Sequence, residues 1–170
     1  MPPAKKYQRL DGGPGVADVA RLFRGLSRPR DRTSAAWAFY QGLMFNTVLE
    51  CTDAHIKNYV VMLSGNAVTL APLYDLATFA PYRTANGPTC SAMKIGGEYR
   101  FAAIGQKHCL AAAAALRVGA DRALDFVNTL RNNVTGAFEA ARDELAHTDR
   151  DTARFAGEVL ASVAALPLVR

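Results

Sequence analysis

Four residues with chemically useful side chains lie within six positions of the sequence. They are an acid (Asp53), an imidazole (His55), a cation (Lys57) and an amide (Asn58), and a second acid, Asp75, follows seventeen residues after the amide. A phosphoryl-transfer site needs such groups, because one acid orients a hydroxyl while an amide and another acid hold Mg²⁺ on nucleotide phosphates. The spacing therefore makes this stretch a candidate site for phosphoryl transfer.

Each of these residues also has a simpler interpretation. Asp53 could accept backbone N–H bonds in a capped turn, and Asp75 could be the N-cap of a short helix. His55 lies among apolar residues and could be a packing residue, while Lys57 could be a solvated cation. Spacing alone leaves both interpretations of Asp53 and Asn58 open. The combination favours a site, because each residue type supplies a separate requirement of one reaction.

Composition indicates an ordinary soluble globular protein. The chain has 170 residues, of which 50% are hydrophobic and 21% charged, so it can bury a core as a single domain. No apolar run approaches the roughly 18 residues of a membrane span, and the start of the sequence lacks the apolar region of a signal peptide. Three widely spaced cysteines predict neither a disulfide framework nor a zinc site. We therefore expect a cytoplasmic protein without membrane contact.

The net charge of +5 is mild and could favour an anionic ligand or partner. Several arginines near the N-terminus could form a basic patch, although a solvated helix face is the preferred interpretation: Arg21, Arg24, Arg28, Arg30 and Arg32. No pattern of stacking aromatic residues or groove-reading side chains accompanies them. Direct binding of nucleic acid is therefore not expected.

Periodicity and turn residues divide the chain into five consecutive parts of a single domain. These are an extended lead-in (1–15), two helices (16–51), a catalytic loop with a hairpin and an acid (52–76), a loop and hairpin (77–104), and a helical bundle (105–170). The second helix is expected to run from Asp31 or Thr33 to about Glu50 and to lead directly into the candidate site. Turns at Gly65-Asn66 and Gly96-Gly97 predict the two hairpins, and Gly87 and Pro88 indicate a loop. A helix boundary is placed at Gly119 and another at Thr148-Asp149.

The motif Asp53-x-His55-x-x-Asn58, followed by Tyr74-Asp75, resembles the catalytic and metal-binding loops of the HipA family of toxin kinases. Its spacing is also similar to that of phosphatidylinositol kinases, which share the kinase-like fold. The resemblance to the C-terminal half of HipA continues, in order, through residues 6–15, Phe45-Asn46, residues 70–75 and residues 92–97. It covers nearly the whole chain.

The resemblance implies a role for each candidate residue. Asp53 would accept the proton of a substrate Ser or Thr hydroxyl as the hydroxyl attacks the γ-phosphorus of ATP. Asn58 and Asp75 would hold Mg²⁺ through oxygen ligands. The residues implied in ATP or phosphate binding are His55, Lys57, Asn58, Tyr74 and Asp75. The implied partners are a protein substrate, such as a component of translation, and a HipB-like DNA-binding antitoxin of a type II toxin–antitoxin system.

Three features depart from the family pattern. Glu50-Cys51 replaces the small or amide residues expected before the loop, and the extra carboxylate of Glu50 could alter the local charge. Ala54 replaces a second acid that often follows the catalytic one. The glycine-rich, mainly β lobe of a complete kinase has no counterpart before residue 52.

The expected fold is therefore mainly α with small β hairpins, the helical C-terminal lobe of a protein-kinase-like fold with the N-terminal lobe absent. Alone, such a lobe is expected to bind ATP weakly and to transfer phosphate poorly. The alternative is a non-catalytic interaction module that binds an antitoxin or a separate N-terminal lobe in trans.

Overall fold

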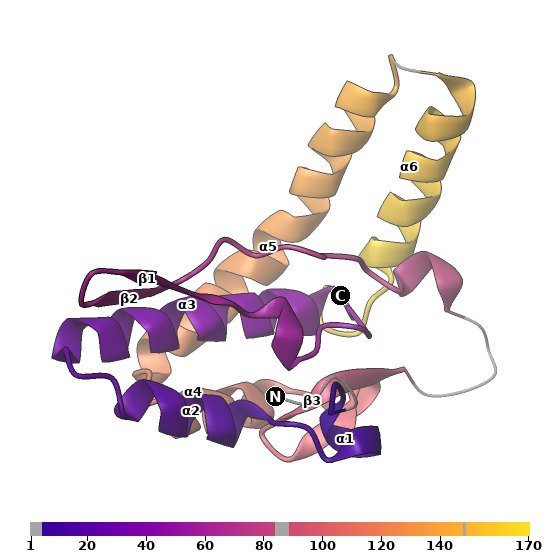
Figure 1. The fold of residues 1–170 in the computed structure, drawn as a ribbon. Coiled ribbons are helices and arrows are strands. Elements are labelled where there is room, and N and C mark those ends of the chain that lie inside the picture. Colours follow the sequence, from indigo (N-terminus) through magenta and orange to yellow (C-terminus); the bar gives the residue numbers. More distant parts are fainter. Residues whose placement is uncertain (1–4, 84–88, 148) are drawn as a thin grey trace.

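Helices dominate the computed structural model, which describes residues 5–83, 89–147 and 149–170. The strands form two separate antiparallel pairs (Figure 1). The expected loop at Gly87 and Pro88, the start of the lead-in (1–4) and the helix boundary at Thr148 lie outside the described residues. A mainly α architecture with two small hairpins confirms the predicted fold class. Within the described ranges, we find no helix with the length and apolar character to cross a membrane.

The described residues form six helices, four strands and three short 3₁₀ turns. The helices are α1 (Gln8–Asp11), α2 (Val16–Arg24), α3 (Pro29–Val48), α4 (Gln106–Ala115), α5 (Ala120–Leu145) and α6 (Arg150–Ala164). The strands are β1 (Val61–Ser64), β2 (Ala67–Leu70), β3 (Cys90–Ile95) and β4 (Glu98–Arg100). Three short 3₁₀ turns, η1 (Ile56–Asn58), η2 (Ala80–Tyr82) and η3 (Phe101–Ala103), complete the set.

Helix α3 is the central element, and Phe39, Tyr40 and Met44 along it are completely buried. It begins at Pro29 rather than at the predicted Asp31 or Thr33, because the fixed φ of proline suits the first position of a helix. The carboxylate of Asp31 instead accepts a hydrogen bond from the backbone N–H of Val68 at 2.9 Å. This bond attaches β2 to the side of α3 and so fixes the hairpin that follows the candidate site.

Both predicted hairpins are present. Strands β1 and β2 pair in register from Val61 with Leu70 to Ser64 with Ala67. Strands β3 and β4 turn at Gly96, which has φ +56°, and a Cβ built there would lie 2.4 Å from the backbone oxygen of His108. Glycine is therefore required for both the left-handed backbone and the close packing of this hairpin on α4.

The predicted extended lead-in contains one helical turn, α1. The backbone oxygen of Tyr7 accepts hydrogen bonds from the N–H groups of Asp11 and Gly13, both at 3.0 Å, and Gly12 ends the turn in the left-handed region. The side-chain oxygen of Gln8 accepts a bond from the N–H of Lys94 at 2.7 Å. The segment is therefore attached to β3 by a contact between residues 86 positions apart, which local sequence patterns do not predict.

The helices of the predicted C-terminal bundle (105–170) are α4, α5 and α6. The second half of α5 and α6 form an antiparallel pair that projects from the body of the molecule, whereas the first half of α5 lies in the body and packs on α4, which also contacts α2 (Figure 1). Apolar side chains such as Leu49, Val134, Val163 and Leu166 form a second core at the base of this pair. The carboxylate of Asp149 caps α6 by accepting the N–H groups of residues 151 and 152.

Candidate active site

The candidate loop is a series of tight turns that begins where α3 ends. The N–H of Cys51 donates to the oxygen of Asn46 at 2.8 Å and closes the end of the helix. The N–H of His55 donates to the oxygen of Asp53 at 2.8 Å, and the N–H of Asn58 donates to the oxygen of His55 at 3.0 Å. This folding leaves the side chain of Asp53 58% exposed and buries Asn58. The two key side chains therefore differ in environment although they are five residues apart.

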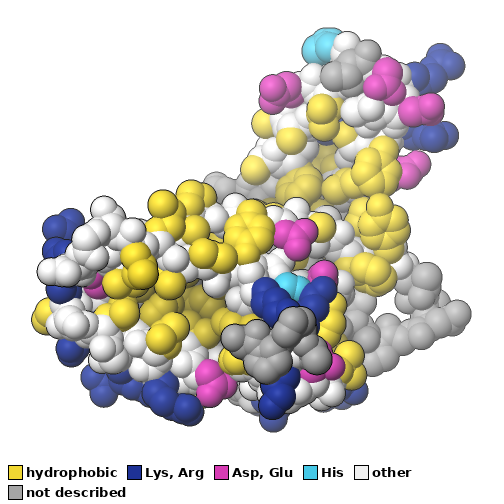
Figure 2. Space-filling view, viewed as in Figure 1, with side chains coloured by type: hydrophobic (Ala, Val, Ile, Leu, Met, Phe, Trp, Pro, Cys, Tyr) yellow, Lys and Arg dark blue, Asp and Glu magenta, His cyan; other side chains and the backbone are white. Residues whose placement is uncertain are grey.

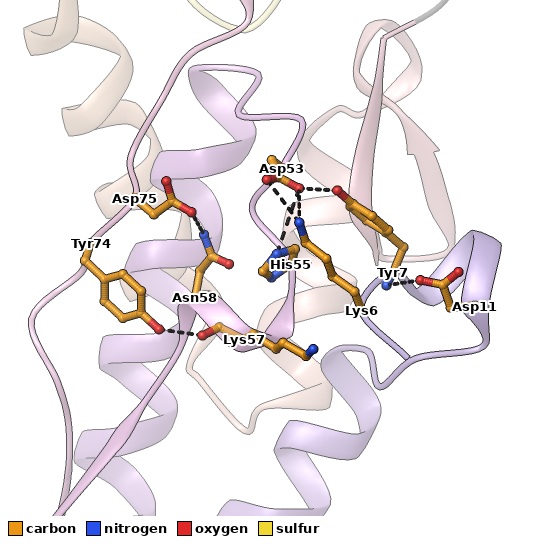
Figure 3. A network of polar contacts seen from close by, with 9 residues as sticks. All are labelled: Lys6, Tyr7, Asp11, Asp53, His55, Lys57, Asn58, Tyr74 and Asp75. Atoms are coloured by element: carbon orange, nitrogen blue, oxygen red, sulfur yellow. Dashed lines mark hydrogen bonds and ion pairs between the residues drawn. The ribbon is translucent and has the colours of Figure 1, made fainter. Parts of the chain in front are cut away.

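The β1–β2 hairpin brings Asn58 and Asp75 together. Asn58 precedes β1 and Asp75 follows β2, and the amide nitrogen of Asn58 donates to Oδ2 of Asp75 at 2.8 Å (Figure 3). Asp75 is exposed and has φ +56°, in the left-handed region that Asp and Asn tolerate better than most residues. Seventeen residues of sequence separation are thus converted into a direct contact.

The Asn58–Asp75 pair has the donor chemistry that Mg²⁺ prefers. Its hydrogen bond uses the amide nitrogen of Asn58 and one carboxylate oxygen of Asp75, so an amide oxygen and a second carboxylate oxygen remain as ligands. Within the described residues, Asp75 forms no ion pair with a basic side chain, and no group of three or more His, Cys, Asp or Glu side chains is placed to hold a metal. Two oxygen ligands fit Mg²⁺, which usually keeps several waters and binds through few carboxylates plus phosphates.

Tyr74 and Lys57 lie on the same side of this pair. The hydroxyl of Tyr74 donates to the backbone oxygen of Lys57 at 2.5 Å (Figure 3), and Tyr74 as a whole residue remains 46% exposed. The side chain of Lys57 is also exposed. The bond connects the residue before Asn58 with the residue before Asp75 and so supports their contact.

Asp53 is contacted by two residues from the beginning of the chain that the sequence did not assign to the site. The hydroxyl of Tyr7 donates to Oδ1 of Asp53, and the amine of Lys6 lies 3.3 Å from Oδ1 and 3.4 Å from Oδ2. Partial burial acts to raise the pKa of Asp53, but the hydrogen bonds from Tyr7 and Lys6 and the charge of Lys6 outweigh it and lower the pKa. Asp53 is therefore a carboxylate at neutral pH.

His55 lies beneath this cluster and is largely buried, with a side chain only 8% exposed. Its Nε2 is 3.9 Å from Oδ1 of Asp53, and its ring meets that of Tyr7 edge-on with the ring centres 5.6 Å apart. Burial, with the charge of Lys6 adding to it, lowers the pKa of His55 below its ordinary value. The imidazole is therefore neutral at pH 7, and contact with phosphate stays a prediction.

The unexpected acid before the loop, Glu50, is engaged elsewhere. Its side chain is 2% exposed, and Oε2 accepts a hydrogen bond from the hydroxyl of Thr89 at 2.9 Å and lies 3.5 Å from Nε of Arg83. Glu50 also has φ 49°. Glu50 connects the end of α3 to the segments on either side of residues 84–88. The guanidinium group of Arg83 partly offsets its negative charge, so its effect on the charge at the candidate loop is reduced.

Two of the arginines near the N-terminus donate hydrogen bonds to backbone oxygens of other segments. Nε of Arg32 donates to the backbone oxygen of Leu26 at 2.6 Å, and Nη1 of Arg24 donates to the oxygen of Ala115 at 3.4 Å. Both guanidinium groups therefore donate hydrogen bonds to carbonyl groups at helix ends.

Both the sequence and the fold of the chain are similar to those of known proteins. A family model described as "HipA-like C-terminal domain" matches residues 1–161. A protein of Sinorhizobium fredii (strain NBRC 101917 / NGR234), named "Putative kinase Y4mE", is 34% identical over 83 residues, which are 48% of this chain and 19% of that protein. The structure of a complex of HipA, HipB and operator DNA, from a toxin–antitoxin system of Shewanella oneidensis MR-1, matches with a TM-score of 0.75 and 20% identity.

The structural match covers 96% of this chain and 41% of the matched chain. At 20% identity this likeness establishes the fold. The chain spans less than half the length of either relative.

Proposed function

The chain belongs to the family of HipA-like C-terminal domains, and on that premise we propose that it is the catalytic C-terminal lobe of a serine/threonine protein kinase. The reaction would transfer the γ-phosphate of ATP to a protein hydroxyl, as the toxin activity of a type II toxin–antitoxin system. The observation that carries the proposal is the placing of an ionised, exposed Asp53 on the same loop as an Asn58–Asp75 oxygen pair. If Asp53 only capped a turn, nothing would require the contact between Asn58 and Asp75 beside it.

In this proposal Asp53 acts directly on the substrate hydroxyl. Its carboxylate accepts a hydrogen bond from the hydroxyl, orients the oxygen for attack and takes up the proton as the new P–O bond forms. Because the side chain is 58% exposed, a protein substrate can reach it from solvent. The lowered pKa of Asp53 keeps it in the accepting form at neutral pH.

Asn58 and Asp75 would hold the magnesium ion of Mg-ATP through their free oxygen atoms. When bound, the ion offsets the negative charge of the phosphates. Lys57, exposed beside the pair, would add a positive charge near the phosphates, and Tyr74 would lie beside the nucleotide. The neutral, buried imidazole of His55 is better suited to support the loop and to donate a single hydrogen bond than to supply charge.

An exposed apolar surface lies next to the site, and it is an argument for a second lobe that would cover it. The large apolar side chains at and next to β1 are exposed: Val60, Val61, Met62 and Leu63. Figure 2 shows hydrophobic side chains gathered over this part of the molecule. We propose that a nucleotide-binding N-terminal lobe, in the same protein or in trans, covers this surface and completes the ATP site. A HipB-like antitoxin and a protein substrate are the further partners that we propose, and the cytoplasm is the proposed location.

Titration calorimetry with ATP in the presence and absence of Mg²⁺ tests the proposal. We expect weak, Mg²⁺-dependent binding to the chain, tighter binding after a matching N-terminal lobe is added, and phosphorylation of a protein substrate that Asp53→Asn abolishes. Glu139→Gln, which removes an exposed acid on α5 outside the site, is the control variant. Absence of Mg²⁺-dependent nucleotide binding even with the added lobe would refute the kinase proposal and favour a non-catalytic module that binds an antitoxin.

A further inference from the structure

The beginning of the chain reaches the carboxylate of the proposed base. Tyr7 and Asp53 are 46 residues apart in sequence, yet the phenol hydroxyl donates directly to Oδ1 (Figure 3). Lys6 lies within 3.4 Å of both carboxylate oxygens. Two neighbouring residues thus contact one functional group, a phenol through one oxygen and an amine through both.

This segment is fixed by contacts that do not involve Asp53. Gln8 is bonded to the N–H of Lys94 on β3, and the oxygen of Tyr7 is held by the turn of α1. A Cβ at Gly13 would lie 2.9 Å from the backbone oxygen of Lys5, so the chain doubles back closely over itself. Because the backbone N–H and oxygen of Tyr7 are both hydrogen-bonded and Gln8 is bonded to β3, the hydroxyl of Tyr7 is presented to Asp53 by a packed support rather than by a loose tail.

The contact supports the carboxylate without covering it. The side chain of Asp53 remains 58% exposed although Tyr7 and Lys6 both contact it. Of the groups that face it, Lys6, Tyr7 and His55, only Lys6 carries a charge at neutral pH. A segment that blocked the site would instead remove most of this carboxylate from solvent.

We propose that Tyr7 and Lys6 are positioning residues for Asp53, Tyr7 fixing the orientation of its carboxylate and Lys6 holding it in the ionised form. This inference rests on the proposed role of Asp53 as the base of a kinase. Fixing one oxygen through Tyr7 leaves the exposed part of the carboxylate to meet the substrate hydroxyl in a defined direction, and orientation of this kind is a large part of catalysis in phosphoryl transfer.

Direct titration of Asp53 in the full chain tests the inference without requiring activity. Carboxyl-carbon NMR follows Asp53 with pH in the wild type, Tyr7→Phe and Lys6→Gln, and Asp53→Asn identifies its signal. We expect the midpoint of the Asp53 titration to rise in both variants, because each loses a hydrogen bond to the charged form. Tyr7→Phe keeps the ring that contacts His55, so the packing is retained.

Matched controls remove the same chemical groups away from Asp53. Tyr82→Phe removes the hydroxyl of a tyrosine that is 59% exposed at η2, and Lys5→Gln removes the exposed amine next to Lys6. Both controls should titrate like the wild type. Wild-type titration of Asp53 in both Tyr7→Phe and Lys6→Gln would overturn the inference.

Phosphoryl transfer, measured with a matching N-terminal lobe, gives the second readout. We expect kcat to fall at least several-fold in Tyr7→Phe with KM for ATP unchanged, and the acid limb of the pH profile to move upward. A faster reaction in Tyr7→Phe would mean that the segment blocks Asp53, and would equally overturn the inference. Failure of the wild type to bind Mg-ATP would count against the proposed function only, because the Asp53 titration is read separately.

Discussion

Three substitutions of Asp75 separate its contribution to folding from its proposed role in metal binding. Asp75 combines a left-handed backbone, with φ 56°, and a 2.8 Å hydrogen bond from the buried amide of Asn58. Asparagine keeps an oxygen acceptor for this amide and tolerates the left-handed region. Glycine tolerates the backbone but loses the acceptor, and alanine loses both advantages.

The two structural terms set the expected order of stability. Loss of the hydrogen bond costs about 1 kcal/mol, since Asp75 is exposed and water can partly replace it. A left-handed alanine costs about 1 kcal/mol more than glycine. The free energy of unfolding should therefore fall by about 2 kcal/mol in Asp75→Ala, by about 1 kcal/mol in Asp75→Gly and by less than about 0.5 kcal/mol in Asp75→Asn.

Urea unfolding and Mg²⁺-dependent ATP binding are measured on the same three variants. Stability should follow the order just given, whereas Mg²⁺-dependent binding should be lost in all three, including the stable Asp75→Asn, because each lacks the carboxylate charge. Wild-type Mg-ATP binding by Asp75→Asn would refute the metal-binding role. Equal stability of Asp75→Ala and Asp75→Asn would refute the structural reasoning.

Three further predictions concern packing and pH. Gly96→Ala should lower the free energy of unfolding by about 2 to 4 kcal/mol, because strain at φ +56° is combined with a 2.4 Å approach to His108; Gly65→Ala, with φ +55° and open space, should lose only about 1 kcal/mol in the same urea assay. Gly136 lies on an exposed part of α5, and a Cβ built there would contact nothing. Gly136→Ala should therefore raise the free energy of unfolding by about 0.5 to 1 kcal/mol and with it the melting temperature, and an unchanged melting temperature would contradict this. Stability should fall as the pH drops below about 6.5, because the unfolded state then protonates His55 while burial keeps the folded form neutral. Thermal melts between about pH 7.5 and about pH 5, on either side of the ordinary pKa of histidine, check this. If His55→Gln loses melting temperature with falling pH as steeply as the wild type, the prediction is wrong.

The sequence by itself determined the local parts of the site and the class of the fold. Asp53, His55 and Asn58 are close in space because a short turn keeps residues of such small separation together. The Gly65-Asn66 turn predicted the hairpin, and the hairpin returns Asp75 to Asn58. These inferences succeeded because backbone sterics, turn chemistry and hydrophobic periodicity all act over a few residues.

Only the tertiary structure decided what surrounds those residues. No local pattern links Tyr7 to Asp53, which are 46 positions apart, or Asp31 to the backbone of Val68, 37 positions away. The projection of α5 and α6 from the body likewise depends on which apolar faces find partners in the second core. Local patterns specify a helix, a turn or a hairpin, but the contacts that hold the proposed base in place arise when distant segments of the chain pack together.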